Sequence, residues 1–331
     1  MKKIVVSGIR FFMKFERHLE YFRERARSAG AEIVPVKTEN EMEFQKSAEG
    51  ASAIVVIARK ISAQTIRRLE CCEIILALSV GYDCIDVHAA TEKGIPVSNV
   101  PAYCTDDVAN HAMTLLLALS RKLPLLIQET TVGRWDYNPA RPVFNYRDKL
   151  LGIVGLGKIG RSLLPKALGF GMSVAAYDPY LDDDIFKLMN VRRFHEFSDL
   201  LTESDYVSVH APLTAETYHL FDQRVFDTMK ETAYLINTAR GSIIDQGALY
   251  DALTKRKIAG AGIDVLEKEP LEQDNPLLGL SNIIVTPHIA WYSEESFKNS
   301  MTQGMDEIVR ILNGHRPRFI VNPEIFGMDK H

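Results

Sequence analysis

Short apolar runs alternate with longer amphipathic segments along nearly the whole chain. The runs KIVVSG (3–8), EIVPV (32–36), AIVVIA (53–58) and EIILALS (73–79) are typical of buried strands. The segment at 15–30 has helical spacing and ends at Gly30. A second series of apolar runs begins near residue 151: LGIVG, SVAAYD, YVSVHAP, AYLINTA, GAGIDV and NIIVTPH. Strands that alternate with helices predict an α/β protein with parallel sheets covered by helices on both faces.

The length of 331 residues suits one large or two ordinary domains. A glycine-rich turn at 155–160, far from the N-terminus, predicts that a dinucleotide-binding domain is central. We expect this domain over 102–292, inserted in a flavodoxin-like substrate domain made of 1–101 plus 293–331. A helical run at 296–314 would carry the chain back to the first lobe. Two Rossmann-like lobes with a cleft between them are therefore expected.

The stretch 121–150 mixes aromatics, prolines and arginines without a clean period. A long surface loop is one interpretation. Exposed side chains at Trp135, Tyr137, Phe144 and Tyr146 would be unusual in a monomer, which favours a subunit interface. We therefore predict a homodimer through the nucleotide-binding domain.

Composition narrows the class of protein further. Hydrophobic residues make up 46% and charged residues 25%, and the formal net charge is −4. This balance predicts no nucleic acid partner and no anionic membrane partner. The N-terminus resembles a first strand more than a signal peptide, and the apolar segment 111–120 is too short for a membrane span. The four cysteines show no zinc spacing, so we expect reduced thiols, no metal and a cytoplasmic protein.

The turn Gly155-x-Gly157-x-x-Gly160 follows an apolar strand and precedes a helical sequence. The first glycine permits the sharp turn, the second lets backbone approach a pyrophosphate, and the third allows close helix packing. Asp178 ends the next strand, where a carboxylate accepts hydrogen bonds from a ribose and repels a 2′-phosphate. These features predict NAD rather than NADP; a simple turn residue before Pro179 is the alternative for Asp178. The loop residues expected at the cofactor are Gly155, Leu156, Gly157, Lys158, Ile159 and Gly160.

Three later segments follow strands in turn: NTARGSIID (237–245), GIDVLEKEPL (262–271) and TPHIAWYSEES (286–296). Ligands of open α/β sheets bind at the carboxyl ends of strands. In order and spacing these segments resemble the signatures of the D-isomer-specific 2-hydroxyacid dehydrogenase family, and the resemblance extends over nearly the whole chain, including 81–101. The segment 288–296 is most similar to the branch that holds the C-terminal binding proteins and the glyoxylate and hydroxypyruvate reductases.

The resemblance implies a catalytic set of Arg240, Glu269 and His288. A planar guanidinium suits a carboxylate or a polarised carbonyl, and histidine exchanges protons near neutral pH. Glu269 would stabilise the imidazolium and fix the ring. Each residue alone also fits a structural role: a solvated turn, a loop end or a satisfied histidine. By the same resemblance, the cofactor would contact His210, Ala211, Pro212, Thr238, Ala239, Arg240, Asp264, His288 and Ala290.

The resemblance also places the substrate carboxylate on a turn formed by Ser79, Val80 and Gly81, with Arg240 and His288 completing the substrate site. Successive backbone N–H groups can hold an anion without a charged side chain. Ser79 replaces the more usual glycine, and Ala77 stands where many relatives carry a basic residue. Asn110 likewise replaces the common glutamate. These departures leave the reaction type intact and the identity of the substrate open.

Two functions follow from these features. The first is NAD-dependent interconversion of a small 2-keto acid and a D-2-hydroxy acid, with glyoxylate, hydroxypyruvate and pyruvate-like acids as candidates. The alternative is an NAD(H)-sensing, peptide-binding corepressor module similar to the C-terminal binding proteins. The compact ends of the chain argue against this alternative. Glu269 argues against a formate-type enzyme, and chain length against a phosphoglycerate dehydrogenase with a regulatory extension.

Overall fold

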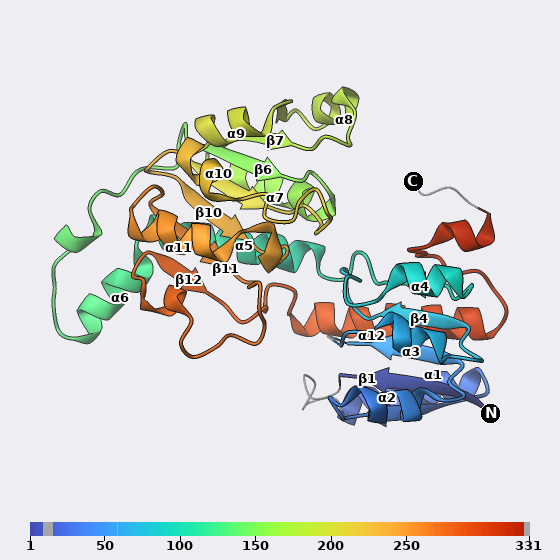
Figure 1. Cartoon of the computed structure of the whole chain (residues 1–331). Coiled ribbons are helices and arrows are strands. Elements are labelled where there is room, and N and C mark those ends of the chain that lie inside the picture. Colours follow the sequence, from blue (N-terminus) through green and yellow to red (C-terminus); the bar gives the residue numbers. More distant parts are fainter. Residues whose placement is uncertain (9–15, 58, 328–331) are drawn as a thin grey trace. The chain divides into compact units, whose positions relative to one another are not determined.

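The computed structural model describes residues 1–8, 16–57 and 59–327 (Figure 1). The last residue of the predicted run 53–58 and the first of the predicted helix 15–30 lie outside these ranges. The chain divides into two compact units: Met1–Tyr103 with Ser293–His331, and Cys104–Tyr292. We refer to them as unit 1 and unit 2.

Unit 1 is built on a five-stranded parallel sheet. Its strands are β1 (Lys2–Ser7), β2 (Ala31–Val36), β3 (Ala53–Val56), β4 (Ile74–Ala77) and β5 (Val97–Ser98). Their order is β2-β1-β3-β4-β5, and every pairing is parallel. This is the flavodoxin-like order, as predicted. The four strand residues of β3 and the four of β4 are all buried, which explains their continuous apolar sequences.

Helices complete unit 1. They are α1 (Glu16–Ser28), α2 (Glu41–Ala48), α3 (Ala63–Arg67), α4 (Val87–Glu92) and α12 (Glu294–Leu312), with a 3-10 turn η5 (Pro323–Phe326). The long helix α12 starts at a capping box in which Ser293 and Ser296 satisfy each other's backbone N–H groups. It contacts α1 and β4, so this helix packs on the sheet of unit 1.

Unit 2 is built on a seven-stranded parallel sheet. Its strands are β6 (Leu150–Val154), β7 (Ser173–Tyr177), β8 (Arg192–Arg193), β9 (Tyr206–Val209), β10 (Tyr234–Asn237), β11 (Gly260–Ile263) and β12 (Ile283–Val285). The order β12-β11-β10-β9-β6-β7-β8 is that of a Rossmann fold with one added strand. Strands β7 and β8 are added on one side of β6, and β9 to β12 are added on its other side. Nucleotides bind at such a switch point in strand order. Together the two sheets confirm the predicted α/β class.

Unit 2 contains most of the helices. They are α5 (Thr105–Ser120), α6 (Leu123–Thr131), α7 (Lys158–Gly169), α8 (Asp183–Leu188), α9 (Phe197–Glu203), α10 (Gln223–Thr228) and α11 (Gln246–Thr254), with 3-10 turns η2 (Asn138–Ala140), η3 (Gly241–Ile243) and η4 (Pro276–Gly279). Helix α5 packs on β10, β11 and β12. None of the helices in the described ranges is long and apolar enough to cross a membrane.

The stretch 121–150 contains the helix α6 instead of being loop throughout. No residue of α6 is buried, and in Figure 1 this helix lies at an outer end of unit 2, away from the sheet. Trp135 is 95% exposed and Ile127 62%. The expectation of an exposed Tyr146 is wrong: its hydroxyl lies 3.0 Å from Ser120 Oγ and its ring packs against Tyr206.

Candidate active site

The glycine turn has the geometry that a dinucleotide loop requires. Gly155 follows β6 with φ of +91°, and a Cβ there would meet Ala211 N at 2.7 Å. A Cβ on Gly160 would meet Gly155 O at 2.4 Å, so α7 packs directly against the turn. A Cβ on Gly157 would meet nothing within 4 Å, which leaves this position open to a phosphate. Leu156 differs from the other loop residues because its side chain is fully buried, so only its backbone can face a cofactor.

Asp178 is joined directly to the glycine turn. Its Oδ2 accepts a hydrogen bond from Leu156 N at 2.9 Å, and its Oδ1 accepts one from Tyr180 N at 3.1 Å. The carboxylate therefore orders the loop as well as standing at the end of β7. A carboxylate has about four acceptor sites, so capacity for ribose hydroxyls remains.

Two buried polar atoms at the carboxyl edge of this sheet have no partner within the described residues: His210 Nδ1 and Thr238 Oγ1. They follow the neighbouring strands β9 and β10. Burial lowers the pKa of His210 to about 4, so its ring is neutral at physiological pH. Its Nε2 lies 2.8 Å from Ser208 Oγ. Orphaned polar atoms beside an open glycine turn fit a bound dinucleotide, since a ligand can supply the missing partners.

The loop after β10 presents Arg240. Asn237 is fully buried and fixes the loop at both ends, because its Nδ2 donates to Arg240 O and its Oδ1 accepts from Ala239 N, both at 2.9 Å. The guanidinium donates to Ala239 O at 2.7 Å. Asn237 was not assigned a role from sequence, although it opens the Asn-x-x-Arg-Gly segment.

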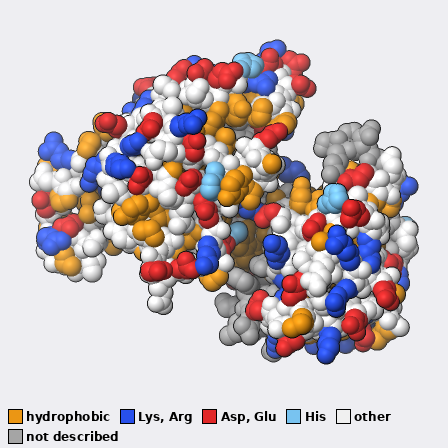
Figure 2. Space-filling view, viewed as in Figure 1, with side chains coloured by type: hydrophobic (Ala, Val, Ile, Leu, Met, Phe, Trp, Pro, Cys, Tyr) orange, Lys and Arg blue, Asp and Glu red, His pale blue; other side chains and the backbone are white. Residues whose placement is uncertain are grey.

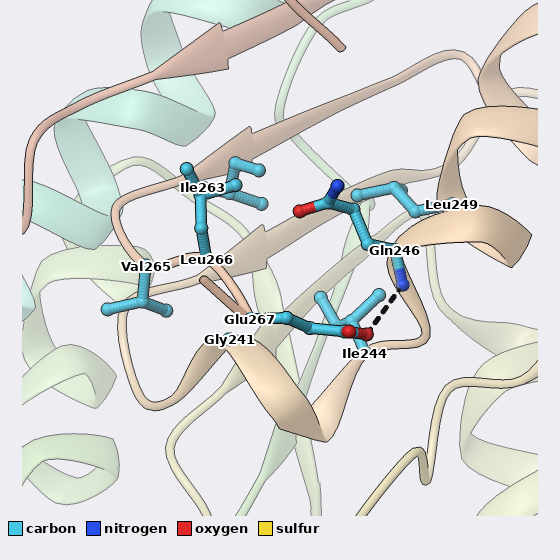
Figure 3. A pocket seen from close by; sticks show the side chains of 8 residues that line it. All are labelled: Gly241, Ile244, Gln246, Leu249, Ile263, Val265, Leu266 and Glu267. Atoms are coloured by element: carbon cyan, nitrogen blue, oxygen red, sulfur yellow. Dashed lines mark hydrogen bonds between the residues drawn. The ribbon is translucent and has the colours of Figure 1, made fainter. Parts of the chain in front are cut away.

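Gly241 brings this loop into backbone contact with the segment that carries Glu269. A Cβ on Gly241 would lie 1.9 Å from Leu266 C and 2.4 Å from Glu267 N. Figure 3 shows Gly241 and Leu266 lining one small pocket, with the Glu267 carboxylate directed at Gln246 N, 2.9 Å away. The glycine in the Arg-Gly pair is therefore required by close approach, since any side chain would push the two loops apart.

Glu269 and His288 are in direct hydrogen-bond contact. Glu269 Oε2 lies 2.8 Å from His288 Nδ1, and Glu269 Oε1 accepts from Leu266 N at 2.9 Å. Burial raises the pKa of the Glu269 carboxyl, but the hydrogen bond and charge of His288, the Leu266 N–H and the charge of Arg240 together hold this pKa below its ordinary value. An ionised carboxylate can only accept, so His288 carries its proton on Nδ1 and leaves Nε2 for proton exchange.

Asp264 holds the turn on which His288 stands. The residue is 1% exposed, and its carboxylate accepts from Ile289 N at 3.0 Å and Ala290 N at 2.8 Å. Its backbone carbonyl accepts from His288 N at 2.8 Å. His288 itself has φ of +51°, a left-handed conformation that is uncommon for a residue other than glycine. Thus Asp264, placed near the nicotinamide by resemblance, also determines the conformation of the His288 turn.

In unit 1, the turn at Ser79–Gly81 has its carbonyl groups tied back into the protein. Ser79 O accepts from Val100 N at 3.1 Å, Val80 O from Asn99 Nδ2 at 2.7 Å, and Gly81 O from Ser79 Oγ at 2.6 Å. In a trans peptide the N–H points opposite to the preceding carbonyl. The N–H groups of Val80 and Gly81 therefore point away from these contacts, and in the described part of the chain they have no acceptor. Asn99 is a residue that the sequence analysis missed.

The structure thus brings together Arg240, Glu269 and His288 at the carboxyl edge of the unit 2 sheet, with Asp264 beneath them. Gly155, Gly160, Asp178, His210 and Ala211 meet around the switch point. Lys158, Ile159 and Pro212 are adjacent in sequence to these groups and form none of the contacts described above. No group of three or more His, Cys, Asp or Glu side chains suited to a metal ion occurs within the described ranges.

Fold and site define a dinucleotide-binding α/β oxidoreductase, and comparison with known proteins gives its family. The family model for the NAD-binding domain of D-isomer specific 2-hydroxyacid dehydrogenases matches residues 113–290. A glyoxylate reductase from Korarchaeum cryptofilum is 37% identical over 275 residues, which cover 82% of each chain. A D-3-phosphoglycerate dehydrogenase from Methanocaldococcus jannaschii is 36% identical over 88% of this chain, which spans only 55% of that relative's length.

Among solved structures, D-lactate dehydrogenase from Aquifex aeolicus, complexed with NAD and lactic acid, superposes with a TM-score of 0.83 at 27% identity over 94% of this chain and 96% of that one. The chain belongs to the D-isomer-specific 2-hydroxyacid dehydrogenase family. Membership confirms the fold, the enzyme class and NAD as the cofactor predicted from sequence. The relatives named above are dehydrogenases and reductases, which gives no support to the corepressor alternative.

Proposed function

We propose that this protein reduces a small 2-keto acid to the D-2-hydroxy acid with NADH, and oxidises the product in reverse. The observation that carries the proposal is the 2.8 Å pair of His288 and Glu269 with Arg240 beside it, all on loops at the carboxyl ends of parallel strands. Such a site supplies an acid–base group and a fixed cation, which are the protein groups that carbonyl reduction requires.

In this proposal His288 Nε2 delivers the proton to the carbonyl oxygen during reduction and removes it during oxidation. Glu269 keeps the other ring nitrogen protonated and stabilises the positive charge on the ring. Arg240 polarises the carbonyl or binds the carboxylate of the substrate through its planar fork. NAD supplies the hydride chemistry when it is bound. One hydride and one proton added across the C=O bond give the hydroxy acid, so atoms and charge balance.

The cofactor would be held by the glycine turn, by Asp178 and by the loops after β9 and β10. The open position at Gly157 suits the pyrophosphate, and the N-terminus of α7 adds its dipole. His210 Nδ1 and Thr238 Oγ1, both buried without a partner among described residues, would gain partners from the bound cofactor. Asp178 would accept from the ribose and disfavour a 2′-phosphate.

The substrate carboxylate would bind the N–H groups of Val80 and Gly81. This assignment is supported by the tied carbonyls of Ser79 and Val80, whose peptide units carry those two N–H groups and turn them away from the hydrogen-bonded side. Neither residue has a charged side chain, so the turn suits a small carboxylate by dipoles alone. Ala77 offers no cation for a phosphate group, which favours glyoxylate, hydroxypyruvate or pyruvate over a phosphorylated acid.

A homodimer through unit 2 is the proposed assembly. Helix α6 and the segment after it expose a group of apolar side chains: Leu123, Ile127, Val132, Trp135, Tyr137 and Phe144. Several large exposed apolar side chains in one short stretch of chain favour an association site. Elsewhere, on the face drawn in Figure 2, basic and acidic side chains are interspersed, which suits neither a nucleic acid nor an anionic membrane. The four cysteines form no disulfide, in keeping with a reducing, cytoplasmic location.

The test is NADH oxidation by the purified protein with a panel of keto acids that contains glyoxylate, hydroxypyruvate, pyruvate and 3-phosphohydroxypyruvate. Wild type should turn over at least one of the first three, and His288→Ala should lose at least about a thousandfold in kcat while still binding NADH. Binding of NADH without turnover of any acid above the His288→Ala background would overturn the enzyme proposal in favour of an NAD(H)-sensing module.

A further inference from the structure

His111 on helix α5 contacts Thr286 and Asp264, close to the turn that carries His288. No role follows for it from the sequence. Its Nε2 is 3.0 Å from Thr286 Oγ1 and 3.5 Å from Asp264 Oδ1. Thr286 Oγ1 in turn lies 2.5 Å from Asp264 Oδ1. Helix α5 packs on β11 and β12, so these three side chains come from three elements that meet at one place in unit 2.

The direction of the hydrogen bonds in this group can be derived. An ionised carboxylate only accepts, so the Thr286 hydroxyl hydrogen must point at Asp264. The Thr286 oxygen is then available only as an acceptor toward His111, whose Nε2 must carry a hydrogen. The chain of donors therefore runs from His111 through Thr286 to Asp264. Asp264 holds the His288 turn because its carboxylate accepts from the Ile289 and Ala290 N–H groups and its backbone carbonyl accepts from the His288 N–H.

The turn needs this support, because the left-handed conformation of His288 is unfavourable for a residue other than glycine. It persists only where surrounding contacts hold it. If Asp264 turned away, the Ile289 and Ala290 N–H groups would lose their acceptors. The backbone could then relax, and the imidazole would move off Glu269. Asp264 keeps its orientation because Oδ1 receives the Thr286 hydroxyl and faces the His111 N–H.

We propose that His111 is a positioning residue for the proposed dehydrogenase reaction: through Thr286 and Asp264 it fixes the turn that aims His288 at the substrate. It touches neither substrate nor cofactor in this proposal. The inference rests on the proposed function for its kinetic consequence, but its structural consequence, the orientation of His288, is independent of any turnover.

The first experiment compares His111→Leu, which removes the N–H, with His111→Gln, whose side-chain amide can place an N–H near the position of Nε2. With NADH and glyoxylate, we expect kcat to fall about tenfold in the leucine variant and to stay within about twofold of wild type in the glutamine variant. The KM for NADH should change by less than about twofold in both. His88→Leu, at an exposed site on α4, is the control for loss of a histidine.

A second pair of variants tests the same chain of hydrogen bonds at its middle. Thr286→Val removes the hydroxyl and keeps the shape of the side chain, while Thr286→Ser keeps the hydroxyl. The valine variant should lose about as much in kcat as His111→Leu, and the double variant should lose little more than either, because both interrupt one pathway. Additive losses would overturn the proposal, and so would equal losses in the valine and serine variants.

The structural readout is the NMR spectrum of the histidine rings at constant pH without substrate. The His288 ring signals should shift in His111→Leu and Thr286→Val and return toward wild type in His111→Gln and Thr286→Ser. This pattern in a protein without turnover would support the positioning role and reject the proposed function. Unchanged His288 signals in both disruptive variants would reject the positioning role, whatever the activity.

Discussion

His288 Nδ1 lies 2.8 Å from Glu269 Oε2, although 18 residues and strand β12 separate the two in the chain. The pair leaves Nε2 as the nitrogen that exchanges a proton. Glu269 accepts this hydrogen bond as a carboxylate. Its pKa is lowered from the ordinary 4.5, so the carboxyl group stays ionised at pH values somewhat below 4.5. The contribution of this group to folding stability is therefore present above that value and lost as the pH falls through the folded-state pKa.

Glu269→Gln tests this relationship by removing the charge and keeping the shape. The partner of His288 Nδ1 then becomes a neutral amide, which no longer stabilises a positive charge on the ring, so kcat for keto-acid reduction should fall at least about tenfold with little change in NADH binding. The measurement is kcat of wild type and variant at one pH with saturating NADH. An unchanged kcat would show that Glu269 does not support the acid.

Asp178 is expected to have two separable effects. Asp178→Asn keeps an oxygen for the Leu156 N–H, removes the charge and takes away the acceptor of the Tyr180 N–H. The preference for NADH over NADPH in kcat/KM should therefore fall at least about tenfold, with a modest loss of thermal stability. Asp178→Ala should relax the same preference and also weaken NADH binding, because the loop loses its acceptor. An unchanged cofactor ratio in both variants would contradict the ribose assignment.

Gly241→Ala tests the contact between the two catalytic loops. The added Cβ would overlap the Leu266 backbone, so the Arg240 loop must shift, at a cost of about 1–3 kcal/mol in the free energy of unfolding. We expect a lower melting temperature and a loss of kcat that exceeds the loss in NADH affinity. Gly279→Ala, where a Cβ would meet nothing within 4 Å, is the matched control and should resemble wild type.

Asn99→Ala frees the Val80 carbonyl and lets the 80–81 peptide rotate, so the Gly81 N–H is no longer held outward. The KM for the keto acid should rise about tenfold, while NADH binding measured by fluorescence stays the same. Ser79→Ala frees only the Gly81 carbonyl, whose peptide unit carries the Tyr82 N–H, so the rise in KM should be smaller in that variant. If NADH affinity changed in parallel with KM, the turn would have a general structural role.

The proposed dimer predicts a change of mass for a charged substitution on α6. Ile127→Asp should convert a dimer to a monomer in light scattering coupled to gel filtration, because a buried unpaired carboxylate is costly. Leu188→Asp on α8 replaces an even more exposed apolar side chain, 84% against 62% for Ile127, and should leave the mass unchanged. A monomeric wild type, or loss of the dimer in both variants, would reject α6 as the interface.

By itself the sequence determined the class of fold and the residues to examine. Continuous apolar runs specify buried parallel strands, because both faces of such a sheet are covered, and the spacing of Gly155, Gly157 and Gly160 specifies the turn that follows β6. The very short strands β5 and β8 were missed, since two residues carry no periodicity.

Only the tertiary structure decided which polar groups meet. Nothing local in the sequence indicates that Asn99 restrains Val80, that Gly241 must admit the Leu266 backbone, or that His111 on helix α5 reaches Thr286 after strand β12. These contacts join elements that are distant in the chain, and their geometry depends on the packing of α5 and of neighbouring strands. Residue types therefore fix the chemistry that is available, whereas the order of strands in the sheet decides which of it is brought together.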